Sequence, residues 1–452
     1  MSPELVYLLL IFGLLVIPRF LQQFKLPAPL TCLLFGVAAM LVLGRKSHDE
    51  VVALLATLGI SSLFLFAGLE VELKALRRGL WPLVIHLVIR LLTLLAVGWL
   101  GWRYAHLSWQ ASGLLALALL TPSTGFIIDT LGRLGLDEKE QFWVTNKAIA
   151  GELLALVSLF VVLQAANPPL QIAGSSLALL AMLLGLPLLF VALGRWVLPH
   201  SPGSEFSLLV MVGVIAAYIT YSLGVYYLVG AFITGLVARL LRQRMPKLAS
   251  HDNLHAVRLF ASFFVPFYFF NAGTKVPAGA LSLEALGIGL ALTAVVLPLR
   301  VGVICVQRKL MFGEAFSTGL RVGTALAPTL IFTLVLAGIL RDRFHVSDAL
   351  FGGLLLYAAL TTLLPSLVFR TPFDVDPVEN EPEHLAPAAG GAASTLMVPG
   401  TSEWHASRAP AGGVVNPPPP MPSPGAQTAR SAPEVADDGP LPEDSGRTDR
   451  TA

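Results

Sequence analysis

Charged residues are scarce in this chain. Only 13% of its 452 residues are Asp, Glu, Lys or Arg, whereas 55% are hydrophobic, and the mean hydropathy is +0.74. A water-soluble domain with this balance would expose large apolar patches and aggregate. The composition therefore excludes the ordinary soluble classes and predicts a membrane protein. The net charge of +2 does not indicate a nucleic-acid partner, and none is expected.

Patterns for cofactors and catalysis are also lacking. The two cysteines, Cys32 and Cys305, lie in apolar stretches, where buried small side chains are the ordinary interpretation. The nine histidines lie mostly in loops and lack the spacing of a metal site. No Ser, His and Asp set gathers at one level of the predicted helix ends. We therefore expect no metal, haem or other cofactor, and no enzyme.

Thirteen apolar stretches lie between Leu5 and Phe369, each of a length suited to the ~30 Å hydrocarbon core. They are expected at residues 4–20, 26–43, 51–70, 81–104, 111–131, 140–165, 172–198, 205–223, 225–241, 259–274, 281–307, 314–338 and 348–369. The first lacks the charged start and the cleavage site of a signal peptide. The eighth and ninth are separated at Gly224 only because the segment is too long for one span. The sequence predicts an all-α polytopic membrane protein with about 13 transmembrane helices.

Lysine and arginine are unevenly distributed between the two sides of these spans. One side holds most of them, including the clusters at 74–78 and 239–247, while the other holds chiefly Arg45, Lys46, Arg103, Lys275, Arg341 and Arg343. The richer side is cytoplasmic by the positive-inside rule. We therefore expect an inner-membrane protein with its N-terminus outside and its C-terminal tail in the cytoplasm.

The composition changes abruptly near Asp374. Fourteen of the 32 prolines follow Asp376, among Ala, Gly, Ser and acidic residues. Such a segment cannot bury enough apolar surface to fold. We predict a transmembrane domain at 1–373 and a disordered cytoplasmic tail at 374–452.

Two sequence phrases recur at one offset. An aromatic run followed by Ala-Gly-x-x-Val contains Gly68 in the third span and Gly273, 205 positions later, in the tenth. Pro122 of Thr-Pro-Ser-Thr and Pro328 of Ala-Pro-Thr are 206 positions apart. The equivalent spans are seven apart, and an odd number turns the second copy upside down. The sequence predicts an inverted repeat with two crossing broken helices, which is typical of transporter binding sites.

Each proline removes a backbone N–H and displaces the preceding turn, so carbonyls are released at membrane depth. Those carbonyls, the neighbouring hydroxyls and the dipoles of the half-helices can together surround an ion. A simple kink is the alternative for either proline alone. The shared offset of Pro122 and Pro328 and their neighbours, including Thr329, favour a binding site.

Ionisable side chains inside spans are costly and become functional candidates. Glu152 lies ~18 Å along the sixth span, at about 1.5 Å per residue, and hence near the bilayer centre. Burial favours the protonated carboxyl, which suits a group that alternately holds a proton and a cation. A permanent ion pair with an arginine is the alternative.

Basic residues in the spans have more than one interpretation. Arg300, after Pro298, is expected to compensate the charge of Glu152, or else to hold the carbonyls of a broken helix. Lys147 precedes Glu152 by five residues, so the two do not stack on one helix face. Lys147 either contributes to transport or extends to the cytoplasmic interface.

The remaining charged residues of the spans are expected to have structural roles. Arg90 and Arg321 are assigned to ion pairs or to cavities facing the cytoplasm. Asp129 and Glu70, near helix ends, are expected to be solvated or to cap their helices.

Four phrases in order carry a family resemblance: Lys25-Leu-Pro-Ala-Pro-Leu30, Phe66-Ala-Gly-Leu-Glu70, the aromatic phrase from Phe264 to Val276, and Leu320-Arg-Val-Gly-Thr-Ala-Leu-Ala327. Over residues 5–370 the chain resembles the monovalent cation/proton antiporter superfamily, in its branch of potassium-efflux antiporters and sodium/proton exchangers. The resemblance implies a homodimer in which a core domain moves against a dimerisation domain, an elevator-like form of alternating access.

The resemblance also implies the site. It assigns the cation and the proton to Glu152, beside Gly151, and to the Ser/Thr-rich break, here Thr121, Ser123 and Thr124. The chain departs from the branch at Gly151, where Gln or Asp usually precedes the acid, and at Pro328-Thr-Leu330, where Gly-Gly-Glu is usual. One carboxylate beside arginines that stay protonated implies electroneutral exchange of one proton for one cation.

The sequence thus predicts a secondary active transporter that exchanges Na⁺ or K⁺ for protons. One alternative is proton-coupled transport of an anionic solute, since Lys147, Arg300 and Arg321 outnumber Glu152. Another is a sensor or scaffold of the same fold whose Pro-rich tail recruits partners.

Overall fold

The computed structural model describes residues 3–24, 26–43, 49–71, 79–165, 167–201, 203–224, 226–245, 248 and 250–369. The predicted tail lies outside the described residues. The main helices are α1 (Pro3–Gln22), α2 (Ala28–Leu43), α3 (Glu50–Leu69), α5 (Leu80–Tyr104), α6 (Trp109–Leu120), α7 (Thr124–Leu131), α8 (Glu138–Gln164), α9 (Pro169–Trp196), α10 (Glu205–Ser222), α11 (Tyr227–Leu240), α12 (His251–Thr274), α13 (Leu283–Phe312), α14 (Phe316–Ala325), α15 (Leu330–Phe344) and α16 (Asp348–Val368).

Each of the thirteen expected stretches coincides with a helix or with a pair of helices. Within the described ranges, ten helical segments are long and apolar enough to span a membrane, or eleven if the bent pair α14 and α15 is one span. The difference from thirteen lies in α2 and α11, which are only 16 and 14 residues long. The chain leaves the helical conformation at Gly224, whose φ of +76° favours glycine, so α10 and α11 are separate helices. The protein is a multi-pass membrane protein.

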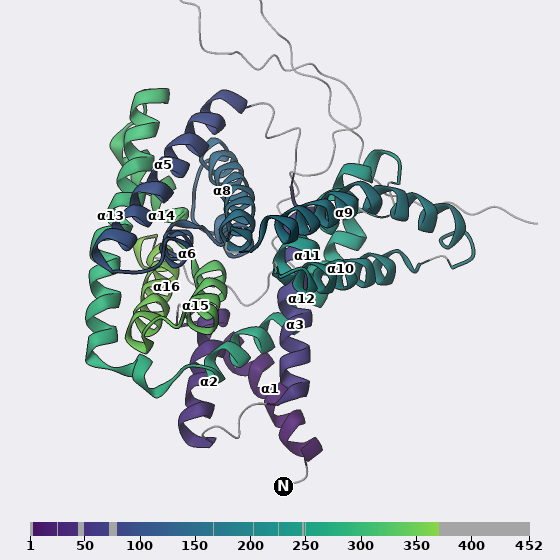
Figure 1. Ribbon diagram of the computed structural model, residues 1–452, viewed down its shortest axis with the longest axis horizontal. Helices are drawn as coiled ribbons and strands as arrows, with labels where there is room; N and C mark the ends of the chain where they lie inside the picture. Colours follow the sequence, from purple (N-terminus) through teal and green to yellow (C-terminus); the bar gives the residue numbers. More distant parts are fainter. Residues whose placement is uncertain are drawn as a thin grey trace, which may run out of the picture. The chain divides into compact units, whose positions relative to one another are not determined.

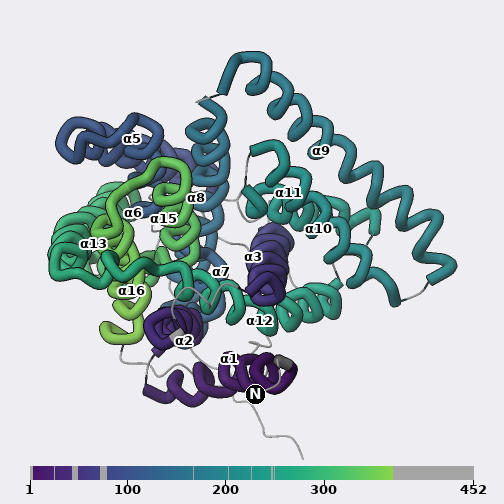
Figure 2. Tube along the Cα trace, turned by 60° about the horizontal axis from the view of Figure 1, so that its bottom comes forward, coloured from purple at the N-terminus to yellow at the C-terminus, as the bar shows by residue number. Residues whose placement is uncertain are grey.

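The helices pack in two groups (Figure 1). In the first group α3 packs against α11 and α12, and α12 packs against α2. Figure 2 shows α3 between α11 and α12. In the second group α5 packs on α6, and α13 packs on α14 and α16. The short helix α7 contacts α3 of the first group and α8 of the second.

The repeated glycines have the same role in both halves. A Cβ atom at Gly68 on α3 would lie 2.3 Å from the carbonyl oxygen of Phe232 on α11, and one at Gly273 on α12 would lie 2.2 Å from that of Leu33 on α2. Only glycine allows the two backbones to come so close, as in small-residue contacts between membrane helices. The repeated phrase therefore marks two close helix crossings of the first group.

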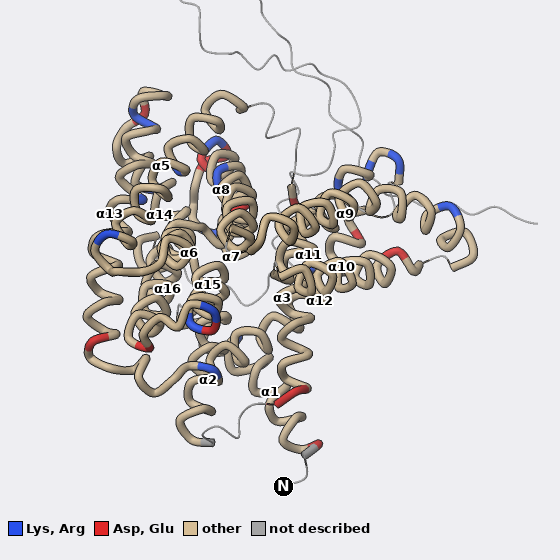
Figure 3. Tube along the Cα trace, viewed as in Figure 1, with Lys and Arg blue, Asp and Glu red and all other residues tan. Residues whose placement is uncertain are grey.

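Charged residues lie mainly towards the ends of the described helices (Figure 3). Both cysteines are buried and free, as expected, with Cys32 and Cys305 at most 1% exposed. The exceptions to the apolar interior are concentrated near the broken helices, where the candidate site lies.

Asp49 connects the start of α3 to α1 through hydrogen bonds. Its carboxylate accepts from the backbone N–H groups of Val51 and Val52 and from the Tyr7 hydroxyl, the last at 2.6 Å. The bond from Tyr7 holds the pKa of Asp49 below its usual range. Since the folded-state pKa is the lower one, this stabilisation is complete at neutral pH and is lost as the pH falls through it.

We expect Asp49→Ala to lower the free energy of unfolding by about 1 kcal/mol, the usual cost of an N-cap. Thermal unfolding in detergent measures this change, and Tyr7→Phe, which keeps the cap, is the control and should cost less. If the two variants lose the same stability, the cap contributes nothing.

Candidate functional site

Two helix breaks meet in the second group. Residues 121–123 separate α6 from α7, and residues 326–329 separate α14 from α15, which are bent by 55°. The N–H of Ser123 donates to the carbonyl of Pro328 at 2.8 Å, and the Ser123 hydroxyl oxygen accepts from the N–H of Ile331 at 3.0 Å. Pro122 is buried within the first break. The two proline-containing breaks are therefore in direct contact.

The carbonyls released at the end of α6 all have partners. Leu117 accepts from the backbone N–H of Thr121, and Ala118 accepts from the Thr333 hydroxyl at 2.7 Å. The carbonyl of Leu119 accepts from the Tyr357 hydroxyl at 2.6 Å, and that of Leu120 accepts from the Arg90 guanidinium. Buried backbone groups are normally satisfied in this way. These four carbonyls are therefore used within the protein.

Arg300 binds backbone carbonyls at the end of α14, as Arg90 does at the end of α6. Its guanidinium donates to the carbonyls of Leu326 and Ala327 at 2.9 and 2.8 Å, and to the Tyr357 hydroxyl at 3.1 Å. Arg300 thus holds the carbonyls of a broken helix, the second of the two roles considered from sequence. The remaining break residue, Thr329, shares a hydroxyl contact of 3.1 Å with Thr361 on α16.

Glu152 is buried at the middle of α8 and is 4% exposed. Its carboxylate lies beside the hydroxyl and the backbone N–H of Thr124, at the N-terminus of α7. That helix end carries positive partial charge, which favours a carboxylate. No ion pair of Glu152 is found among the described residues, so the alternative of a permanent pair with an arginine gains no support.

Two buried hydroxyls flank the first break. Thr121 and Thr124 are at most 2% exposed, and neither side-chain oxygen has a hydrogen-bond partner in the described part of the chain. Buried hydroxyls are normally paired, so these two, of which that of Thr124 lies beside the Glu152 carboxylate, suggest a ligand set. Hydroxyl and carboxylate oxygens are ligands suited to a small hard cation.

The other basic residues of the spans have internal partners. The Lys147 ammonium is 1% exposed and donates to Gln307 on α13 at 3.0 Å, so it does not extend to the interface. Arg321 forms an ion pair of 3.1 Å with Glu140 and donates to the carbonyl of Gly135. These residues are engaged in holding helices together.

Glu70 and Asp129 differ in their surroundings. Asp129 on α7 forms an ion pair of 2.8 Å with Arg258 on α12. Glu70 follows α3, and one of its carboxylate oxygens is buried without a hydrogen-bond partner in the described residues. Its carboxylate is near enough to Asp129, Arg258 and Glu152 to interact with them electrostatically. Of the two roles expected for Glu70, solvation is therefore wrong for this oxygen, whereas Glu70 does occupy the C-cap position of α3.

Sequence reasoning missed Tyr357, which connects Arg300 to the end of α6. A signal was present, because Tyr357 lies 205 positions after Glu152, the same offset that relates Gly68 to Gly273. Tyr357 on α16 is therefore the repeat counterpart of Glu152 on α8. A tyrosine inside an apolar span attracts no attention unless the repeat is extended to it.

If Thr124 is a ligand, Thr124→Val should weaken cation binding while keeping the shape of the side chain. We expect the KM for the cation to rise about 10-fold, since a hydrogen bond or ligand contact to a charged group contributes about 1.5 kcal/mol or more. Initial rates of cation-dependent proton flux measure it. Thr293→Val on α13, whose hydroxyl donates only to its own helix, is the matched control and should leave KM unchanged.

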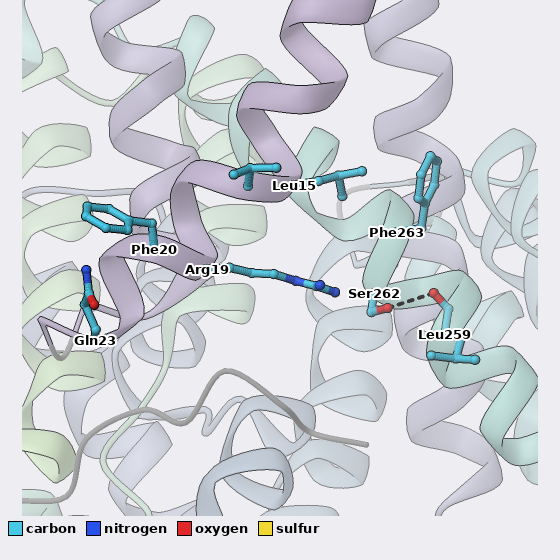
Figure 4. A pocket seen from close by; sticks show the side chains of 8 residues that line it. Leu15, Arg19, Phe20, Gln23, Leu259, Ser262 and Phe263 are labelled. Atoms are coloured by element: carbon cyan, nitrogen blue, oxygen red, sulfur yellow. Dashed lines mark hydrogen bonds between the residues drawn. The ribbon is translucent and has the colours of Figure 1, made fainter. Parts of the chain in front are cut away.

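A groove between α1 and α12 lies elsewhere in the first group (Figure 4). It is lined by apolar side chains together with Arg19, Gln23 and Ser262. None of the residues predicted for the ion site lines it. We assign this groove no part in exchange.

Comparisons with known proteins agree with the fold. Residues 7–374 match the family model for the transmembrane sodium/hydrogen exchanger. A probable Na⁺/H⁺ antiporter 3 of Methanocaldococcus jannaschii is 25% identical over 383 residues, covering 81% of this chain and 95% of the relative. The sodium proton antiporter MjNhaP1 from the same organism, solved at pH 8, has a similar fold, with a TM-score of 0.59 at 16% identity over 80% of this chain and 96% of that one. Because the family model spans most of the chain, this protein belongs to the sodium/hydrogen exchanger family of antiporters.

Proposed function

We propose that this protein exchanges a monovalent cation, Na⁺ or K⁺, for protons across the membrane. The observation that carries the proposal is the buried carboxylate of Glu152 beside Thr124, with the buried, unpartnered hydroxyl of Thr121 at the same helix break. Na⁺ is favoured over K⁺ because the matched relatives are sodium/proton antiporters.

The proposed chemistry is competition for one site. A proton neutralises Glu152 directly, whereas a cation neutralises it while accepting oxygen ligands from the two threonines. Ser123 stays at the edge of this site, since its hydroxyl oxygen already accepts from Ile331. Gly151, beside Glu152 on α8, adds no side chain. Because one carboxylate carries both occupants, one cation replaces one proton and the exchange is electroneutral.

The charges around the site support a cation over an anionic solute. Arg90 and Arg300 are engaged with the carbonyl ends of α6 and α14, and Lys147 with Gln307. Their positive charges offset the negative ends of half-helices and balance a site that is negative when empty. We assign Arg300 and Lys147 this background compensation, without direct contact to Glu152.

Alternating access is proposed as the transport route. The breaks and Glu152 belong to the second helix group, and the first group, with its close glycine crossings, would be the scaffold against which the second moves.

We further propose a homodimer in the inner membrane, with the N-terminus outside and the tail cytoplasmic. Mass photometry and reporter fusions at each terminus test these points.

Purified protein in liposomes with an enclosed pH dye tests the exchange. An inward gradient of Na⁺ or K⁺ chloride should drive proton efflux, and choline chloride should not. The rate should be unchanged when a membrane potential is clamped on or off. Proton movement driven only by organic anions, or none with any cation, would rule out the proposed function.

A further inference from the structure

Arg90, for which the sequence predicts only an ion pair or a cavity facing the cytoplasm, contacts the end of the first broken helix. It lies on α5, outside the broken helices, and its guanidinium donates to the carbonyl of Leu120, the last residue of α6. The next residue is Thr121, one of the two threonines with an unpartnered hydroxyl. A group that fixes the Leu120 carbonyl therefore also fixes the position of Thr121.

Gly151 makes room for this contact. A Cβ atom at Gly151 would lie 3.0 Å from the Cζ atom of Arg90, 3.1 Å from one terminal nitrogen and 3.2 Å from Nε. These distances are tighter than nine in ten real Cβ contacts, so a side chain at this position would require the guanidinium to shift by a few tenths of an ångström. Gly151 precedes Glu152, so the guanidinium packs on α8 immediately beside the carboxylate-bearing residue.

Arg90 and Arg300 form a matched pair. Arg90, on the helix before the first broken helix, holds the end of α6, and Arg300, on the helix before the second, holds the end of α14. Each places a positive charge at a negative helix end. The two halves differ because Arg90, in the first half, reaches the Leu120 carbonyl across Gly151, the residue before Glu152.

We propose that Arg90 is a positioning residue for cation exchange, and that Gly151, which has no side chain, leaves the space that its guanidinium occupies. This inference rests on the proposed function. Arg90 does not touch the cation. It keeps the end of α6, and with it Thr121, at a fixed position relative to Glu152.

The test is a double-mutant cycle on the full chain in liposomes, with sodium as the cation. Gly151→Ala and Arg90→Met should each raise the KM for sodium about 10-fold, and the double variant should show the same 10-fold rise, because both changes remove one contact. Arg90→Lys retains a charged donor for Leu120 and should bring KM back to within about threefold of the unmodified protein. Gly185→Ala on α9, where a Cβ atom would meet nothing within 4 Å, is the matched control and should not alter KM.

The proposal is overturned if the KM increases of Gly151→Ala and Arg90→Met multiply in the double variant, or if Gly151→Ala leaves KM unchanged. Thermal unfolding of the same four proteins in detergent gives a second reading, since the Tm losses of the two single variants should also fail to add. A protein that shows no cation-driven proton flux but retains this non-additive Tm would contradict the proposed function alone. Additive Tm losses in a protein that exchanges sodium would contradict the Arg90 and Gly151 contact alone.

Discussion

Replacing Glu152 by glutamine is expected to lower the initial rate of cation-dependent proton flux by at least 100-fold. Glutamine keeps the size and the hydrogen-bonding capacity of the side chain but can neither release a proton nor carry the negative charge that a cation needs. In this buried position no solvent replaces that charge, because Glu152 is 4% exposed. The expected loss is therefore in exchange itself and not in folding.

The measurement uses dye-loaded liposomes with an imposed sodium gradient, alongside size-exclusion profiles and Tm values that confirm an intact fold. Glu152→Asp keeps the charge on a shorter side chain and should retain measurable exchange with a raised KM for sodium. Glu140→Gln is the matched control, because Glu140 is also buried but caps the start of α8 and pairs with Arg321. Full sodium-dependent flux in Glu152→Gln would show that the shared site is elsewhere.

The second large effect is expected in the fold. Gly273→Ala places a Cβ atom 2.2 Å from the carbonyl oxygen of Leu33 and 2.9 Å from the Cα atom of Gly36. Both neighbours are backbone atoms, so no side-chain rotation relieves the overlap, and α12 must move away from α2. We expect a loss of about 3 kcal/mol, the upper part of the usual range for overpacking.

The yield of monodisperse protein and the Tm in detergent measure this loss. Gly287→Ala on α13 is the control, since a Cβ atom there meets nothing within 4 Å. Gly68→Ala, the repeat counterpart on α3, should behave as Gly273→Ala does, because its Cβ atom would meet the Phe232 carbonyl at 2.3 Å. A Tm for Gly273→Ala equal to that of Gly287→Ala would mean that the crossing is looser than the structure indicates.

The crossing of the broken helices changes how a cation would be held. The proline pattern predicts freed carbonyls, and the chain does free them, but the four at the end of α6 are taken by Thr121, Thr333, Tyr357 and Arg90. The candidate ligands left at the first break are the hydroxyl oxygens of Thr121 and Thr124. The proposed selectivity therefore depends on the positions of two threonines, and through Leu120 on Arg90.

Several features were determined by the sequence alone. The scarcity of charge forces the chain into a membrane, because apolar surface on this scale has no other stable environment. The offset of about 205 between Gly68 and Gly273, and between Pro122 and Pro328, indicates the repeat, because each half must build the same crossing and the same break. These are local or periodic signals, which a single chain carries without knowledge of its contacts.

Other features were decided only by the tertiary structure. Whether Arg300 faces Glu152 or the carbonyls of α14 depends on side-chain contacts between α13 and the second break, and Lys147 finds its partner Gln307 160 positions away. The missing side chain at Gly151 matters only because α5, which carries Arg90, packs against α8. The hydrogen-bond partner of a buried group inside a membrane depends on which helices pack together, and the sequence spacing within one helix does not specify that packing.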